Sequence, residues 1–272
     1  MSYLEIPRGQ LDRMLELGRV EGNALMIPNR HMDAGWSDYR VLRPESPIQM
    51  WYISQAAEDR ARLERFPERE TDWARVAPGR GKGDDIHIAA WYRYLEGANP
   101  EYPEQLLDVQ WGEVARRMDR MAHDDGDPEA WDVHHWQEIN PVHTEALVQL
   151  TCGGPQIVYH GGLLHTRLRY YDADARRPGL PADVAALVER LDADSVHVTL
   201  VNTSLLHPRR LIVQAGAFGE HCFTRVRDEL GAEAATAVGG RCLELLLQPC
   251  GVARLNLEME RYVYQPSYDQ PI

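Results

Sequence analysis

The spacing of apolar residues changes near Gly154, and this change most constrains how the chain folds. Before it, apolar residues after Pro103 recur at steps of three and four, which is typical of one face of a helix. After it, apolar and polar residues alternate, as in a half-exposed strand. We therefore predict an α+β fold, in which a mainly helical region over residues 1–153 is followed by an antiparallel β-sandwich over residues 154–272. The helical positions are Leu107, Trp111, Val114, Met118 and Met121, and the alternating ones are Leu164, Thr166, Leu168 and Tyr170.

Other elements follow from the same signals. Asn140 and Pro141 have the residue types of an N-cap and a first helical position, and Gly153 that of a left-handed stop, so a helix is predicted between them. A short helix is expected over residues 182–191, and a hairpin connection over residues 205–208. Further helices are predicted at 9–18, 55–65 and 85–96, and further strands at 196–200, 211–213, 243–247 and 255–259.

Charge limits the classes of partner. The 272 residues include 29 Lys and Arg and 42 Asp and Glu, for a net charge of −13. This excess repels phosphates and anionic lipid headgroups, so neither nucleic acid nor a membrane is an expected partner. No apolar run approaches the ~20 residues of a membrane helix, and the N-terminus lacks an export signal. We expect a soluble, cytoplasmic protein whose four cysteines, without any CxxC spacing, are buried thiols.

Polar and aromatic residues are densest over residues 131–143 (WDVHHWQEINPVH), before the predicted helix. Loops that precede a helix commonly display functional groups, and helix N-termini attract anionic or hydroxyl-rich ligands. The candidate catalytic residues are His135, Glu138 and His143, which have the chemistry for proton transfer. The candidate substrate-binding residues are Trp131, Trp136, His134 and Asp38. The alternative interpretation is a junction that packs with its hydrogen bonds satisfied.

Metal binding is another use of the same side chains. His134 or His135 with Glu138, joined by His143 or His160, supplies donors that Zn, Fe or Mn accept. The spacing matches no specific metal motif, so no metal ligand is assigned and a divalent metal stays an alternative cofactor. His31 and Asp33 match the HxD pair of non-haem iron enzymes but lie outside the strand-rich region.

Two further groups of polar residues are candidates. Asp33 with Asp38, and Asp84 with Asp85, are carboxylate pairs of the type that glycoside hydrolysis uses, or else helix caps and solvated turns. Gly216 and Gly219 predict a bulge or tight bend that redirects Glu220 and His221. A structural hydrogen-bonding corner is the alternative for this second group.

Three segments, 140–145 (NPVHTE), 153–156 (GGPQ) and 198–202 (VTLVN), resemble in their order the end of a group of carbohydrate-active proteins. In these proteins an (α/α) toroid precedes a β-sandwich. The resemblance covers residues 130–272 and includes no catalytic motif. It implies action on a polysaccharide or glycoside, with the site on the toroid. About twelve helices need more chain than the first 150 residues provide, so a partner subunit or second copy is expected to complete the unit.

The leading hypothesis is therefore a carbohydrate-active enzyme or enzyme subunit that acts on a glycoside or polysaccharide by acid/base chemistry. The alternatives are a non-catalytic β-sandwich assembly subunit and a metal-dependent, cupin-like β-barrel enzyme. A carbohydrate is the expected substrate, and a homo-oligomer or a complex with a partner subunit is the expected assembly. Paired carboxylates in a pocket favour the first hypothesis, a broad apolar interface the second, and converging His and Glu donors the third.

Overall fold

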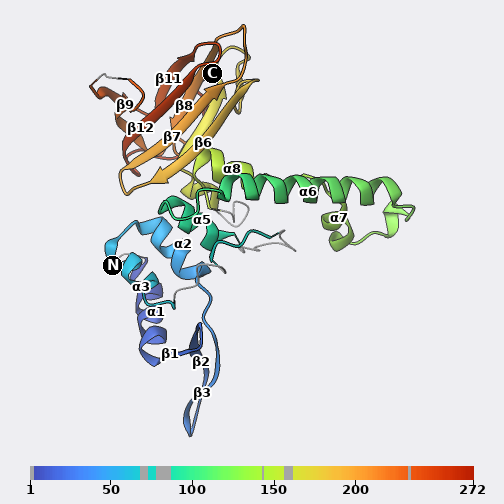
Figure 1. Ribbon diagram of the computed structural model, residues 1–272, viewed down its shortest axis with the longest axis vertical. Helices are drawn as coiled ribbons and strands as arrows, with labels where there is room; N and C mark the ends of the chain where they lie inside the picture. The colour runs from blue at the N-terminus through green and yellow to red at the C-terminus, as the bar shows by residue number, and fades with distance from the viewer. Residues whose placement is uncertain (1–2, 68–72, 78–86, 143, 156–161, 232–233) are drawn as a thin grey trace.

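The computed structural model of the chain describes residues 3–67, 73–77, 87–142, 144–155, 162–231 and 234–272. It is elongated, with two β-sheets at one end, helices in the middle and a small sheet at the other end (Figure 1). One long helix projects sideways from the middle. The described residues form seven α-helices and three antiparallel sheets, which confirms the α+β class.

The N-terminal region contains a sheet that the sequence analysis did not predict. Helix α1 (Glu5–Leu17) leads into strands β1 (Arg19–Glu21), β2 (Ala24–Met32) and β3 (Gly35–Val41), which pair in that order. Gly22 and Gly35 have φ angles of 60° and 98°, and glycine adopts this turn conformation without strain. The sequence pattern did not indicate these strands, because few of their residues are buried and the alternation of apolar and polar residues is therefore weak. In β2, Leu25 is the one buried residue.

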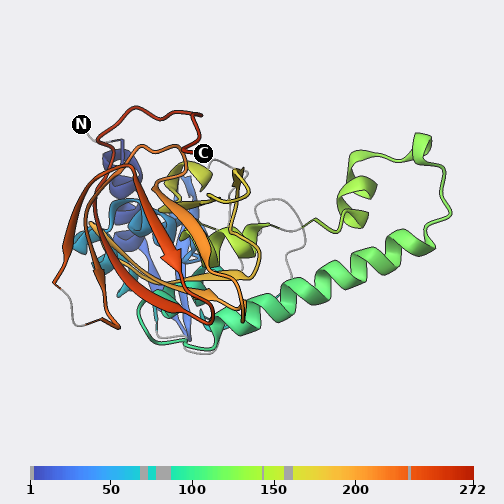
Figure 2. The ribbon, with the colours of Figure 1, turned by 90° about the horizontal axis from the view of Figure 1, so that it is seen from above.

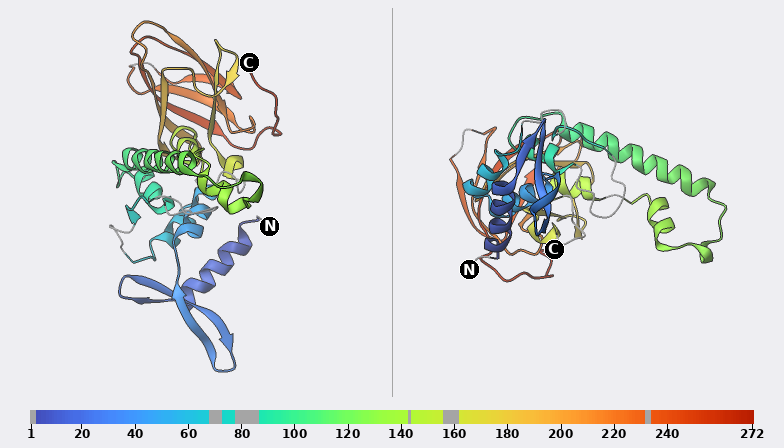
Figure 3. Two further views of the ribbon diagram at one scale, coloured as in Figure 1. Left: turned by 90° about the vertical axis from the view of Figure 1, so that its right-hand side faces the viewer. Right: turned by 90° about the horizontal axis from the view of Figure 1, so that it is seen from below.

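The central helices pack around aromatic side chains. Trp51, Tyr52 and Trp91 are almost completely buried, and the Tyr52 and Trp91 rings lie 5.1 Å apart. Aromatic side chains bury large apolar areas, so this cluster is the main core of the helical part. The layers are visible in Figure 3, with the central helices between the large sheets and the small N-terminal sheet. The helices are α2 (Glu45–Ser54), α3 (Ala57–Leu63) and α5 (Ile88–Leu95); the predicted helices at 9–18, 55–65 and 85–96 correspond to α1, α3 and α5.

A buried carboxylate joins the first three helices. The Asp59 side chain on α3 has no exposed surface, and it accepts hydrogen bonds from Arg8 on α1 and Arg62 on α3, each at 2.6 Å. Ser54 at the end of α2 donates a third bond of 2.6 Å. Burial raises the pKa of Asp59, but the hydrogen bonds from Arg8 and Ser54 and the charges of Arg8 and Arg62 lower it below its ordinary value on balance.

Helix α6 (Tyr102–His123) begins in the core and then leaves it. Tyr102 and Leu106 are buried at its base, whereas its distal part extends away from the body (Figure 2). The chain then turns through the 3-10 helix η1 (Pro128–Ala130) and returns as α7 (Val133–Ile139). Arg117 holds α7 against α6, because it donates to the Gln137 carbonyl oxygen at 2.6 Å. We call residues 107–139 the arm.

Two antiparallel sheets form the two-sheet region, residues 168–260. Val198 and Leu200 of one sheet and Leu211 and Val213 of the other are fully buried and belong to the same apolar cluster. Helix α8 (Glu145–Cys152) contacts this region at β6 and β4. The first sheet has the order β10 (Thr236–Gly240), β9 (Cys222–Asp228), β12 (Val252–Glu260), β7 (Ser195–Asn202) and β6 (Val184–Leu191). The second has the order β11 (Cys242–Leu247), β8 (Arg209–Ala215), β4 (Leu168–Asp172) and β5 (Arg177–Pro178).

Most of the predicted strands are confirmed, with three corrections. The predicted strands at 196–200, 211–213, 243–247 and 255–259 lie within β7, β8, β11 and β12. Residues 182–191 were expected to be helical, but they form β6, because pairing with β7 outweighs their helix propensity. Residues 205–208 link β7 to β8 in the other sheet, so they cross between sheets and do not close a hairpin. The strand expected from Leu164 begins only at Leu168, after the 3-10 helix η3 (Gly162–His165).

Candidate functional site

Helix α7, which carries His134, His135, Trp136 and Glu138, lies beside the projecting part of α6, away from the two-sheet region (Figures 1 and 2). His135 Nε2 is 2.6 Å from Asp124 Oδ2, and Glu138 forms a 2.6 Å ion pair with Arg120 of α6. Asp132 caps α7, accepting from the backbone N–H groups of His134 and His135. His135 and Glu138 are therefore paired with groups of the same arm, although the side chains of Glu138 and His135 remain 56% and 27% exposed.

The tryptophans of the arm also stack on neighbouring side chains. The Trp131 ring stacks on His135 with a centroid distance of 4.3 Å, and Trp136 meets Trp131 edge to face at 4.8 Å. Helix α7 ends at Ile139 and α8 begins only at Glu145, so the predicted helix start at Asn140 is wrong. The Asn140 side chain instead accepts a hydrogen bond from the Val142 N–H in the turn between the two helices. The predicted catalytic residue His143 lies outside the described residues.

The remaining candidates are scattered. Asp38 is in β3 at the far end of the molecule, where Asn29 and Arg40 donate to it, so it does not join the arm residues. His31 packs against the Trp36 ring on the same hairpin. Asp84, Asp85 and His160 lie outside the described residues.

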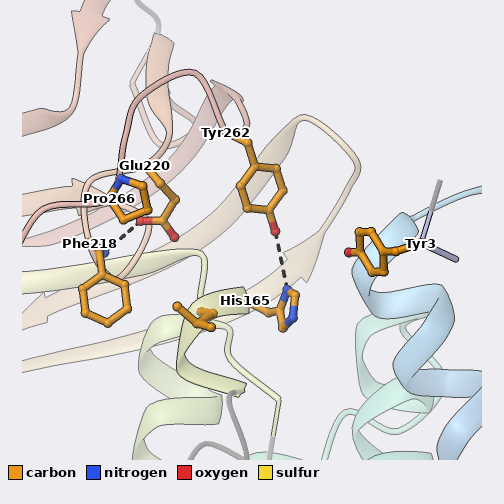
Figure 4. Close-up of a pocket in the computed structure, with 7 residues that line it drawn as sticks. Tyr3, His165, Phe218, Glu220, Tyr262 and Pro266 are labelled. Carbon is orange, nitrogen blue, oxygen red and sulfur yellow. Dashed lines mark hydrogen bonds between the residues drawn. The ribbon is translucent and has the colours of Figure 1, made fainter. Parts of the chain in front are cut away.

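A cleft of about 280 Å³ lies between the N-terminal helix and one end of the two-sheet region (Figure 4). Tyr3 approaches it from the start of α1, and His165 from the end of η3. Glu220 and Tyr262 approach it from the loops after β8 and β12. The residues that line it are Tyr3, Leu164, His165, Phe218, Glu220, Tyr262 and Pro266.

Glu220 is held by the tight bend that the glycines predicted. Gly216 and Gly219 have φ angles of 83° and 66°, and a Cβ atom at Gly216 would lie 2.5 Å from the Glu220 carboxyl carbon. The Phe218 N–H donates to Glu220 Oε2 at 2.8 Å, whereas the buried Oε1 atom has no hydrogen-bond partner. Burial raises the pKa of Glu220, and the backbone N–H groups of the turn only partly oppose this effect.

His221 lies beside this carboxyl group. Its side chain is completely buried, and Nδ1 accepts the N–H of Tyr262 at 3.0 Å. Burial, together with the charges of Arg167 and Arg261, lowers the pKa of His221 to about 3, so the imidazole is neutral and carries its proton on Nε2. This atom is 3.9 Å from Glu220 Oε1.

His165 and Tyr262 form the opposite wall of the cleft. The Tyr262 hydroxyl is 3.5 Å from His165 Nδ1, and Tyr262 has a strained φ of 59°. Burial and the charges of Arg167 and Arg261 lower the pKa of His165. A neutral imidazole at this position is able to accept a proton or a hydrogen bond, and the raised pKa of Glu220 favours the protonated carboxyl, the form that is able to donate one.

The two arginines are placed behind this wall. Arg167 is 2% exposed and donates to the Tyr52 carbonyl oxygen at 3.3 Å, while Arg261 donates to that of Ile53 at 2.9 Å. The Tyr52 hydroxyl donates to the carbonyl oxygens of Gly153 and His165. These bonds join α2 to the two-sheet region, so they fix the position of His165 relative to the rest of the cleft.

Glu220 and His221 could be predicted from the sequence as a polar corner, whereas the rest of the cleft could not. Tyr3, His165 and Tyr262 are far apart in the chain, and no local pattern marks any of them. The lowered pKa of His165 and the strained backbone of Tyr262 are properties that only the folded chain has.

The described part of the chain has neither a metal-binding cluster nor a membrane-spanning helix. It contains no group of three or more His, Cys, Asp or Glu residues placed to hold a metal ion. None of its helices is both long enough and apolar enough to cross a membrane. The cysteines are all unpaired thiols, of which three are half-buried and Cys250 is exposed, so the expectation of buried thiols does not hold for Cys250.

The comparisons with known proteins give a family but no activity. A family model described as a domain of unknown function (DUF8034) matches residues 3–148, more than half of the chain. The chain therefore belongs to the DUF8034 family. No curated protein and no solved structure matches it. The matched residues include Tyr3 and the arm, whereas the other residues of the cleft come after them in the chain.

Proposed function

We propose that the protein is a carbohydrate-active enzyme or enzyme subunit whose site is the cleft between Tyr3, His165, Glu220 and Tyr262. The observation that carries this proposal is the buried Glu220 carboxyl, which lines a cleft with aromatic walls and has one oxygen atom without a hydrogen-bond partner. Aromatic rings beside a proton-donating carboxyl suit a sugar, since sugars combine apolar ring faces with hydroxyl groups. The site thus lies in the cleft and not at the arm.

Glu220 is the proton donor in this proposal. Its raised pKa keeps the carboxyl protonated to a higher pH than an exposed glutamate, as a general acid requires. The neutral His165 imidazole, on the opposite wall, is the acceptor for a ligand hydroxyl. The rings of Tyr3, Phe218 and Tyr262 provide apolar contact with the sugar.

We further propose that the two sheets form the β-sandwich that the resemblance implies. The apolar cluster shared by Val198 of β7 and Val213 of β8 supports this arrangement. In that case the cleft lies at one end of the sandwich, where loops after β8 and β12 display Glu220 and Tyr262.

The test compares Glu220→Gln with Glu260→Gln, an exposed glutamate at the end of β12. The assay measures calorimetric binding to a panel of neutral and acidic oligosaccharides, and turnover of the corresponding aryl glycosides. We expect Glu220→Gln to retain binding and to lose turnover by about 10²- to 10⁴-fold, since glutamine keeps the shape but not the proton. Glu260→Gln should match the wild type. Failure of the wild type to bind any sugar of the panel, or equal turnover in both variants, would overturn the proposal.

A further inference from the structure

Four arginines lie beside the segments that form the cleft. Within the described part of the chain, no ion pair joins any of them to a carboxylate, although the whole protein carries a net charge of −13. Arg169 donates to the Ala217 carbonyl oxygen at 2.9 Å, in the bend before Glu220, and Arg241 lies 4.4 Å from the centre of the Tyr264 ring. The four are Arg167, Arg169, Arg241 and Arg261.

The end of α2 balances only part of the charge of two of these arginines. Arg167 and Arg261 donate to the carbonyl oxygens of Tyr52 and Ile53, in the last turn of the helix. A helix C-terminus is equivalent to about half a negative charge, so about 1.5 positive charges remain uncompensated. Arg167 Nε and Arg261 Nη1 are also buried without a hydrogen-bond partner. Because a buried charge without a counter-charge is costly, this arrangement is typical of a site whose counter-charge is a ligand.

The groups between the arginines and the cleft add no negative charge. Burial and the charges of the two arginines lower the pKa values of His165 and His221, so both imidazoles are neutral. The raised pKa of Glu220 favours its neutral form. Glu260, next to Arg261 in the chain, is exposed and forms no ion pair with it within the described residues. This side of the cleft is therefore electropositive in an otherwise acidic protein.

The lining of the cleft distinguishes between kinds of anion. The described residues that line it include no arginine or lysine. No guanidinium is therefore placed for the direct, paired hydrogen bonds by which arginines commonly bind phosphate. The polar groups of this wall are His165 and the Tyr262 hydroxyl, and aromatic rings lie beside them (Figure 4). Such a surface suits a single negative charge carried by a ring.

We propose that the cleft binds a ring that bears a carboxylate. The carboxylate lies at the wall formed by His165 and Tyr262 and is attracted by the arginines behind it, while the ring contacts the aromatic side chains. That the ring is a sugar rests on the proposed function of the cleft, under which the substrate is an acidic sugar. Glu220 lies on the opposite wall, so the carboxylate and the proton donor occupy different sides of the ligand.

The first experiment measures calorimetric binding of paired oligosaccharides to the full chain. The two members of each pair differ in one group, which is CH2OH in the neutral member and a carboxylate in the acidic member. Cyclohexanecarboxylate, which has a ring and a carboxylate but no hydroxyl groups, is the third probe. We expect the acidic member of at least one pair to bind about tenfold or more tightly than its neutral counterpart, because buried charges are weakly screened.

The second experiment repeats the measurement with three variants. Arg261→Gln removes the charge, whereas Arg261→Lys keeps the charge and a donor for the Ile53 carbonyl oxygen. The matched control is Arg225→Gln, which changes the net charge equally at an exposed position in β9. We expect the ratio of acidic to neutral affinity to fall about threefold or more in Arg261→Gln and to stay near the wild-type value in the other two. Both ligands are measured on the same protein, so a partly unfolded variant does not alter the ratio.

The outcomes separate this proposal from the proposed function. Equal affinities within every pair would overturn the carboxylate site and leave the proposed function standing. If cyclohexanecarboxylate binds and no sugar does, the carboxylate site is supported and the proposed function is overturned. Binding of none of the probes would overturn both. A charge preference that is unchanged in Arg261→Gln would overturn the assignment to the arginines, and if that variant does not fold, the wild-type comparison decides.

Discussion

Replacing Asp59 by asparagine tests whether the buried carboxylate holds the N-terminal helices together. The carboxyl group has no exposed surface and binds Arg8, Arg62 and Ser54, which come from three different helices. The asparagine side chain would keep the shape but lose the charge, and two guanidinium groups would remain beside it. Removing one partner of a buried ion pair costs about 3 to 5 kcal/mol. Arg62 retains Asp12 as a second partner, so we expect the lower end, about 3 kcal/mol.

The assay is urea and thermal unfolding followed by circular dichroism, with Asp12→Asn as the matched control. Asp12 also pairs with Arg62, at 2.7 Å, but its side chain is 46% exposed, so its loss should cost under about 1 kcal/mol. For Asp59→Asn we expect a Tm lower by about 6 to 12 °C. Equal losses in the two variants would contradict the argument from burial.

The pH dependence supplies a further check on Asp59. Its folded-state pKa lies below the ordinary value of 3.8, so the stabilisation is complete above about pH 4 and is lost as the pH falls through the folded pKa. The difference in unfolding free energy between wild type and Asp59→Asn should therefore shrink below about pH 4. A difference that grows in acid would mean that the carboxylate is not stabilised by its partners.

Two other substitutions test the arm and the cleft. Hydrogen bonds from Arg116 lower the pKa of Glu113 to about 2 despite its burial, so the carboxylate stabilises the arm at neutral pH. Glu113→Gln should therefore loosen the arm above about pH 4.5, and trypsin should cleave near residue 120 several-fold faster. An unchanged rate of cleavage would contradict this role of Glu113. Gly216→Ala should destabilise the chain by about 2 kcal/mol more than Gly239→Ala, measured by urea unfolding. Both glycines have positive φ, but only the Gly216 methyl group would collide with Glu220, so equal costs would contradict the close packing there.

The strands of the two-sheet region could largely be predicted, because their signal is local. Alternate residues of β7 and β12 are buried, so apolar and polar residues alternate within the sequence of each strand. Residues 182–191 were misassigned as a helix because the alternation of β6 is weak, and its pairing with β7 is not visible in the sequence. The small sheet of β1 to β3 was missed for a related reason, since it buries little.

The candidate site shows the limit of arguments from spacing. The cluster over residues 131–143 is rich in polar and aromatic groups, but density along the chain does not show whether those groups converge on one pocket. Tertiary packing brings Tyr3, His165 and Tyr262 together at the cleft. Only the bend before Glu220 could be predicted from the sequence, because its positive φ angles require Gly216 and Gly219.

Helix α6 also has a mechanical consequence. It is one continuous helix of 22 residues, about 33 Å long, and Tyr102 and Leu106 anchor its base among α5 and α8. It therefore acts as a lever: a tilt of about 5° at the base displaces the tip by about 3 Å. The hydrogen bond between Tyr102 and Gln149 of α8 lies at the base of the helix. A small change in the packing of α6 against α8 would therefore produce a larger displacement at the tip of the arm.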